Sequence, residues 1–309
     1  MEGYSTHSEY TVNEMAMTKT TGTGQQNTSF FTGKAEKHSS KIPYRPLIEI
    51  DQTTAVAKTY KYFFAKGIFA GHISKMIPGF AEKQIKVAEA IVNGEFKRFL
   101  DIGTSEGIMI KTIAENNKHI RAVGIEPNGQ MKINYESTRE VKNAEFRQEA
   151  FLASWRDDDG IDIKEFKPAE EFDVINEDCT FQFMNNNRYE QVKAVKKMMT
   201  KDGIFITSEK FHTKNHEANE SKKLEYQRRY FNETQLTEDR ETIVCGMDKD
   251  MVSDVEYEKI LKDYFEHFEE FWNAGNFKGY LASDNLAVLR IFKKNVGDLT
   301  SDFSESSYA

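Results

Sequence analysis

The chain has 309 residues, 39 % of them hydrophobic, and a formal net charge of −8. This length allows one large domain or two small ones, and the negative charge argues against a broad basic surface for nucleic acid or anionic membranes. Two cysteines, Cys179 and Cys245, are too few for a disulfide framework or a cysteine zinc site. The sequence shows no signal-peptide pattern and no apolar run of about 20 residues that would span a membrane. We therefore expect a soluble cytoplasmic protein.

Residues 1–45 are polar and rich in Thr, Ser, Gly, Gln and Asn. This composition predicts a flexible or loosely docked arm. Apolar residues then recur at helical spacing from Ala55, and a second helix is predicted over Ala81–Val92, after a Pro-Gly pair that interrupts the pattern. We expect these two helices, within 46–95, to form a helical cap at the edge of the sheet that follows.

Strands and helices alternate from Phe99 onward. Apolar runs predict strands at 99–102, 121–126, 145–149, 172–176 and 204–208, and helical patterns lie at 108–116, about 131–135 and 188–199. This alternation predicts an α/β domain with a Rossmann-like, doubly wound sheet. A helix at 253–265 and closing strands at 268–272 and 286–292 would complete seven strands. The predicted domain spans 96–294, with an irregular acidic segment at 155–171, a helical insertion at about 212–250 and a flexible tail at 295–309.

The segment Asp101-Ile102-Gly103-Thr104-Ser105-Glu106-Gly107 joins the first predicted strand to its helix. An apolar run ends on an acid and breaks at a small-residue turn, where the backbone can approach a ligand and the helix amides add donors. Glu126 ends the next strand, where an acid can accept both hydroxyl hydrogens of a ribose. Together these features predict a cofactor that contains a nucleoside.

The glycine pattern of this turn separates the candidate cofactors. A dinucleotide fingerprint needs three glycines in G-x-G-x-x-G, and here the central glycine is absent between Gly103 and Gly107. No P-loop lysine follows Gly107, which is succeeded by Ile108 and Met109. A nicotinamide oxidoreductase and a P-loop enzyme are therefore disfavoured, because both need close contact with a phosphate chain.

The turn and Glu126 resemble the class I methyltransferases, which bind S-adenosylmethionine on this fold, and the resemblance covers about residues 80–292. It implies that Asp101 orients the amino group of the methionine part, that Gly103 and Thr104 pass beneath that part, and that Glu126 holds the ribose. The adenine would lie beside Ala150 and Phe151. The implied cofactor contacts come from Phe80, Asp101, Gly103, Thr104, Ser105, Gly107, Glu126, Pro127, Ala150, Phe151, Asp178 and Cys179.

Four further segments, 77–80, 178–184, 201–203 and 208–211, resemble the carboxy-S-adenosylmethionine synthase branch of this superfamily, which serves tRNA wobble-uridine modification. The arginine with which that branch grips the extra carboxylate has no counterpart near Val244. Our first hypothesis is therefore methyl transfer from S-adenosylmethionine to a small molecule. An enzyme of the carboxy-S-adenosylmethionine type acting for tRNA, and a non-catalytic protein that binds S-adenosylmethionine, stay open as alternatives. We expect no membrane partner, and a homodimer is one option.

Residues that follow the fourth and fifth strands are the candidates for chemistry, because they share the carboxyl edge of the sheet. His212 and Glu209 are candidate general bases, and His72, Tyr226, Arg228 and Tyr230 are candidate substrate contacts. Acidic residues are interspersed among Lys222, Lys223 and Arg228, which predicts a solvated helix face first and an anionic substrate or tRNA second. His212 and His216 lack a third ligand at useful spacing, so we expect no metal.

Overall fold

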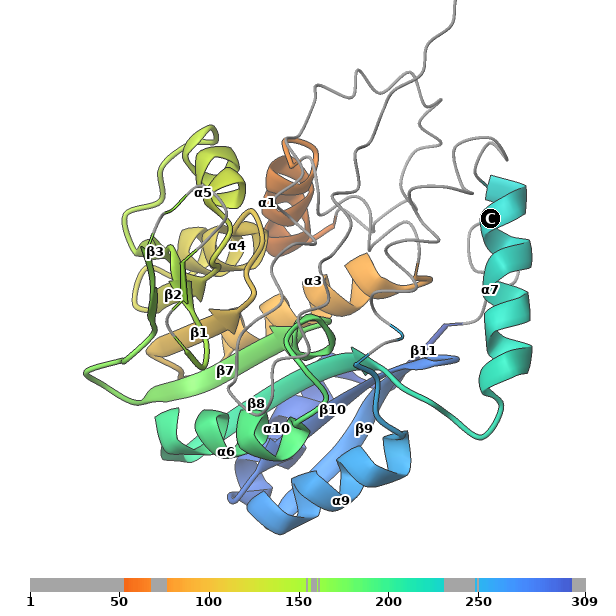
Figure 1. Cartoon of the computed structure of the whole chain (residues 1–309). Coiled ribbons are helices and arrows are strands. Elements are labelled where there is room, and N and C mark those ends of the chain that lie inside the picture. The colour runs from red at the N-terminus through yellow and green to blue at the C-terminus, as the bar shows by residue number, and fades with distance from the viewer. Residues whose placement is uncertain are drawn as a thin grey trace, which may run out of the picture.

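A central mixed sheet organises the computed structural model, which describes residues 53–67, 77–153, 155–156, 160, 162–230, 248 and 250–301 (Figure 1). In this part of the chain the sheet has eight strands in the order β11-β9-β10-β8-β7-β1-β2-β3. Neighbouring strands are parallel except β10, which is antiparallel to both β8 and β9. Their bounds are β1 Arg98–Ile102, β2 Arg121–Ile125, β3 Ala144–Arg147, β7 Phe172–Asp178, β8 Met199–Lys210, β9 His267–Ala274, β10 Phe277–Ser283 and β11 Leu299–Thr300.

This strand order is that of the class I methyltransferase fold, with one short strand, β11, added at an edge. The predicted fold class is therefore confirmed. The chain runs outward from β1 through β2 to β3 and then crosses back to β7 on the other side of β1. Such a reversal leaves a crevice at the carboxyl ends of the two central strands, which is where open α/β sheets bind ligands.

Helices cover both faces of the sheet (Figure 1). On one face lie α1 (Ala55–Phe64), α3 (Phe80–Asn93), α4 (Ile108–Asn116) and α10 (Leu286–Val296), which contact one another. On the other face α6 (Arg188–Met198) packs against α9 (Asp254–Tyr264). The helix α5 (Gly129–Glu136) follows β2, and α7 (His216–Tyr230) follows β8 at the side of the molecule.

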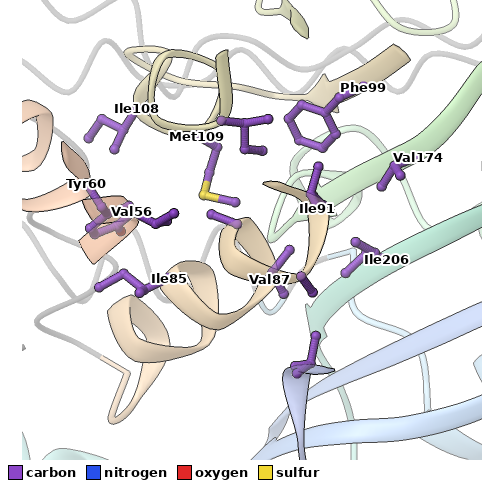
Figure 2. Close-up of a cluster of buried hydrophobic side chains, with 14 of the residues drawn as sticks. Val56, Tyr60, Ile85, Val87, Ile91, Phe99, Ile108, Met109, Val174 and Ile206 are labelled. Carbon is purple, nitrogen blue, oxygen red and sulfur yellow. The ribbon is translucent and has the colours of Figure 1, made fainter. Parts of the chain in front are cut away.

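Alternation along the strands decides which side chains meet which helix layer. Phe99 belongs to the hydrophobic cluster beneath α3 and α4, whereas Leu100 belongs to the cluster on the opposite face, as the period of two in a strand requires. Figure 2 shows Met109 of α4 between the residues of α1 and those of α3, with Phe99 and Val174 beside them. This packing fixes α3 and α4 over the sheet and so fixes the turn between β1 and α4.

Most predicted elements agree with the structure to within a few residues, and the bounds predicted for the helix at 108–116 are those observed. Local chemistry explains several of these starts. Thr54 accepts a hydrogen bond from the amide of Ala57 at 3.1 Å at the start of α1, and Ser253 accepts one from the amide of Glu256 at 3.1 Å at the start of α9. Both are side-chain N-caps, which satisfy an amide that the helix itself leaves unpaired.

Three predictions about the kind of structure that a segment forms are wrong. Residues 286–292 form most of helix α10, because Asn285 caps its first turn and Leu289, Phe292 and Val296 share a buried face. The missing strand is β10, which a two-residue hairpin at Gly275-Asn276 connects to β9. The acidic segment, predicted to be irregular, contains the strands β5 (Trp155–Arg156) and β6 (Asp162–Glu165), which form a small second sheet with β4 (Glu149–Ala150). The strand β11 lies in the predicted tail, which makes the main sheet eight-stranded.

Two features are absent from the described residues. No described helix combines the length and the apolar character needed to cross a membrane. The described residues also contain no group of three or more His, Cys, Asp or Glu side chains arranged to hold a metal ion.

Candidate functional site

Polar side chains gather at the carboxyl edge of the central strands, and the strand alternation divides them into two sets. Val174 and Ile206 belong to the cluster beneath α3, whereas Ile175 and Phe205 belong to the opposite cluster. Residues two or four positions after Val174 or Ile206 along the same strand therefore face α3, and the residues between them face α6 and α9. The same alternation applies to β1, from Phe99, and to β2, from Ala122. The α3-facing set is Asp101, Glu126, Asn176, Asp178, Ser208 and Lys210, and the opposite set is Glu177, Thr207 and Glu209.

The turn after β1 is held in a left-handed backbone conformation at three positions. Gly103, Ser105 and Gly107 have φ values of 68°, 50° and 72°, a region that glycine enters easily and serine does not. The amides of Gly103 and Thr104 donate to the carbonyl of Ile125 at 2.9 and 3.1 Å, which ties the turn to β2. A side chain at Gly103 would collide with Thr180, so this position needs glycine for space as well as for conformation.

Asp101 lies at the centre of the α3-facing set, with 4 % of its surface exposed. Its carboxylate accepts hydrogen bonds from the Thr104 hydroxyl at 2.7 Å and from the Asn176 amide at 2.8 Å. Burial nevertheless raises the pKa of Asp101 from 3.8 to about 7, and these two hydrogen bonds only oppose that rise. A cation placed beside Asp101 would favour its ionised form and gain an ionic partner.

Glu126 follows β2 and is also buried. Its Oε1 accepts a hydrogen bond from the amide of Asn128 at 3.1 Å, and the amide of Ser105 also lowers its pKa. Burial is the larger effect and raises the pKa of Glu126 from 4.5 to about 7. Pro127 and Asn128 then lead into α5, so this carboxylate stands between the turn after β1 and the turn after β2.

Asp178 ends β7, and residues of α3 hold it in place. Lys83, which is fully buried, forms an ion pair with Asp178 and donates to the Ser208 hydroxyl at 3.0 Å. Gln84 donates to Asp178 at 3.1 Å. The Lys83 ammonium also lies 4.2 Å from the centre of the Phe80 ring, a cation–π contact that brings Phe80 to this edge.

Asn176 lies between the two aspartates and leaves one acceptor unused. Its amide group donates to Asp101 at 2.8 Å and lies 3.4 Å from Asp178. Its side-chain carbonyl is buried and has no hydrogen-bond partner among the described residues. Buried acceptors are nearly always paired in folded proteins, so this oxygen is available to accept a hydrogen bond from a ligand or a water.

The segment after β7 completes the edge. Cys179 has a left-handed backbone with φ of 54°, and its amide donates to the carbonyl of Ser208 at 2.6 Å. Burial raises the pKa of its thiol well above the usual value, so the thiol stays protonated. Phe181 stacks on Phe151 with ring centres 5.5 Å apart, next to the fully buried Ala150. The left-handed backbone of Cys179, which is not a glycine, costs about 1–3 kcal/mol, and such strain is typical of functional sites.

Glu209 does not join the α3-facing set, although the sequence made it a candidate base. It is fully buried on the opposite face, where it pairs with Arg188 at 2.8 Å and accepts from the Phe181 amide at 3.0 Å. Glu177 lies beside it, and burial followed by the charge of Glu209 raises the pKa of Glu177 well above 4.5. These groups anchor the segment after β7 from below the sheet, because strand alternation turns Glu209 away from Ser208 and Lys210.

Four of the remaining candidates, His212, Tyr226, Arg228 and Tyr230, lie beyond the end of β8. His212 is exposed, and its ring centre is 4.6 Å from that of His216. Partial desolvation of the ring, followed by the charge of His216, lowers the pKa of His212 below 6.5. Tyr226, Arg228 and Tyr230 fall on α7, but their side chains are outside the described residues. His72 and Cys245 also lie outside them.

Sequence reasoning missed Lys83, Gln84 and Asn176. A signal for Lys83 exists, because it lies three residues after Phe80 and four before Val87, on a helix face that is otherwise apolar. Lysine on such a face requires a buried partner. The sequence does not say that the partner is Asp178, because that contact depends on how α3 packs across β7.

No family model matches the chain, and no curated protein matches it. Solved structures do resemble it. The plantazolicin methyltransferase BpumL in complex with SAH is 13 % identical, with 74 % of this chain and 94 % of that chain covered and a TM-score of 0.49. Human N-acetylserotonin methyltransferase in complex with SAM is 11 % identical, with 75 % and 57 % covered and a TM-score of 0.45. Because both TM-scores lie below 0.5, the fold assignment rests on the strand order.

Proposed function

We propose that this protein binds S-adenosylmethionine and transfers its methyl group to a small molecule. The observation that carries the proposal is the pair of buried carboxylates, Asp101 and Glu126, at the ends of neighbouring parallel strands on either side of a left-handed turn. Asp101 lies beside the point where the strand order reverses, between β1 and β7, and Glu126 lies on the neighbouring strand. The crevice at such a reversal is the usual ligand position in these sheets. The missing central glycine of the turn argues against a pyrophosphate.

The residues of the edge fit this cofactor chemically. An α-ammonium group requires acceptors and negative charge, which Asp101 and the unpaired carbonyl of Asn176 would supply. Ribose hydroxyls require an acceptor pair, which the Glu126 carboxylate would supply, and adenine requires an apolar face such as that of Phe151. The pKa values of about 7 for both acids mean that a positively charged ligand would bind best after both have ionised.

When bound, the cofactor supplies a methyl group activated by a positively charged sulfur. The task of this chain is then to hold the acceptor in line with that methyl group and to exclude water, which can account for much of the rate of such a displacement. His212 is the proposed proton acceptor where the acceptor needs one, because its lowered pKa keeps the imidazole neutral at pH 7. Glu209 is a positioning residue in this proposal, since it supports the segment after β7 from the opposite face.

Calorimetry of the full chain with S-adenosylmethionine and with NAD tests the proposal. We expect S-adenosylmethionine to bind and NAD not to bind. Glu126→Ala should weaken S-adenosylmethionine at least tenfold, because a buried acceptor for two hydroxyls is lost. The exposed Glu136 on α5 offers a matched control, since Glu136→Ala removes the same charge outside the site. Equal affinities for folded Glu126→Ala and wild type would refute the assigned binding mode.

A further inference from the structure

A second charged cluster lies beyond the Lys83–Asp178 ion pair along the edge of the sheet, and it contains two buried lysines. Lys210 ends β8 and Lys223 lies on α7, and their side chains are 0 % and 3 % exposed. Both form ion pairs with Glu220, at 3.3 Å in the case of Lys210. Lys210 also forms an ion pair with Asp248. We call these four residues the two-lysine cluster.

The two carboxylates of the cluster are held differently. Glu220 is largely buried and accepts a hydrogen bond from the Asn276 amide at 2.8 Å, and Asn276 itself is buried. Burial alone would raise the pKa of Glu220, but Lys210 and Lys223 hold it below 4.5. The side chain of Asp248 is 36 % exposed, and Lys210 is its only ion-pair partner among the described residues. Asp248 is therefore the carboxylate that an external anion can replace.

One carboxylate cannot balance two ammonium groups. Burial, followed by the charge of Lys210, lowers the pKa of Lys223 to about 8, so Lys223 is still mostly charged at pH 7. With Glu220 shared between the two lysines, one positive charge remains, and the more exposed Asp248 neutralises it. Removing a charge from water is costly. For Lys210 and Lys223 that cost is already met in the folded protein, so an anion that displaced Asp248 would find two ammonium donors already desolvated and fixed.

The position of the cluster relates it to the proposed methyl donor site. Lys210 follows Ser208 by two residues on the same strand, so both side chains leave the sheet on the α3 side, about 7 Å apart along the strand. Ser208 accepts a hydrogen bond from Lys83, which pairs with Asp178. The two-lysine cluster is thus the next group along the edge after the Lys83–Asp178 pair, which separates it from Asp101 and Glu126.

We propose that Lys210 and Lys223 bind an anionic group, a carboxylate or a phosphate, of the methyl acceptor in exchange for Asp248. This inference deepens the proposed function and rests on it for the identification of the ligand as an acceptor. It assigns the acceptors of this enzyme to small anionic molecules.

The test measures binding of two matched pairs of probes to the full chain saturated with S-adenosylhomocysteine. Benzoate is compared with benzamide, and phenyl phosphate with phenol, so that each pair differs chiefly in charge and the two pairs separate carboxylate from phosphate. We expect at least one anionic probe to bind at least tenfold more tightly than its neutral partner. Lys223→Gln should remove that preference, whereas Lys222→Gln, on the exposed side of the same helix, should keep it.

Asp248→Asn is the second variant, and it tests the exchange without removing a buried group. It should tighten the favoured anionic probe at least threefold, because the competing carboxylate is gone. Equal binding of charged and neutral probes, equal losses in Lys222→Gln and Lys223→Gln, or unchanged binding in Asp248→Asn would each overturn the inference. Binding of S-adenosylhomocysteine is measured separately in every variant. A chain that binds the anionic probes through Lys223 but binds no S-adenosylhomocysteine would refute the proposed function and retain the anion site.

Discussion

Replacing Asp101 by asparagine should stabilise the protein in the absence of ligand and abolish most of its cofactor binding. The folded pKa of Asp101, about 7, is above its ordinary value of 3.8. The folded protein therefore holds a proton that the unfolded chain releases, and the contribution of Asp101 to stability falls as pH rises from about 4 to 7. One pKa unit corresponds to about 1.4 kcal/mol, so the cost of ionising this buried carboxylate reaches about 4 kcal/mol above pH 7.

Asparagine keeps the shape of the side chain and removes the charge. Its amide can donate to the Thr104 hydroxyl, which now donates to Asp101, while its carbonyl can still accept from Asn176. Allowing for imperfect hydrogen bonds, we expect Asp101→Asn to raise the unfolding free energy by about 1–3 kcal/mol at pH 8. The difference between variant and wild type should be about 2–3 kcal/mol smaller at pH 5, where folded wild-type Asp101 is protonated.

Urea unfolding of both proteins at pH 5 and pH 8 measures this difference, with calorimetry of S-adenosylmethionine on the same samples. The variant should lose at least tenfold in affinity, because the ammonium group would lose its ionic partner. A variant that is less stable than wild type at pH 8, or a stability difference that does not change with pH, would show that burial does not control the ionisation of Asp101.

Two further predictions concern the same edge. The affinity of wild type for S-adenosylhomocysteine should rise as pH increases from 6 to 8, because Asp101 and Glu126 lose their protons near pH 7. Calorimetry should find a smaller rise in Asp101→Asn. A wild-type affinity that does not change with pH would contradict the assignment of these two acids to the cofactor site. Gly103→Ala should destabilise the protein by about 2–4 kcal/mol through strain and the collision with Thr180, whereas Ser105→Gly should leave stability unchanged or raise it by up to about 1 kcal/mol. Thermal unfolding compares the pair, and equal losses would show that backbone conformation does not set the turn.

The parts of the fold that depend on local patterns were accessible from the sequence. Asp101 could be placed at a strand end because an apolar run precedes it and a small-residue turn follows. The strand predicted at 286–292 failed because an apolar run of that length also fits a helix, and Asn285, the capping residue, was the signal that distinguishes them. The Gly275-Asn276 pair likewise indicates a hairpin, and it marks the strand that was missed.

The candidate site could be predicted from the sequence where it depends on the end of one strand. It could not be predicted where it depends on packing between elements. Counting by two along β8 assigns Glu209 to the opposite face from Ser208 and Lys210, so the sequence already contained the reason to reject Glu209 as a base. The contacts of Lys83 with Asp178 and of Lys223 with Glu220 are different. Lys223 appears in the sequence as one charge among many. Lys83 interrupts an apolar helix face, which indicates burial, but its partner becomes visible only when the helix and the sheet edge are brought together.

Charge is ordered along the α3 side of this edge, and the order suits a transfer between ligands of opposite charge. Asp101 and Glu126, at β1 and β2, make one end acidic, while Lys210 and Lys223, at β8 and α7, lie at the other end, where displacement of Asp248 would leave one positive charge. Lys83 and Asp178 form a neutral pair between them. A cationic methyl donor and an anionic acceptor would each be attracted to its own end and repelled from the other. We infer that this separation orients the two ligands before any contact is made with the reacting atoms.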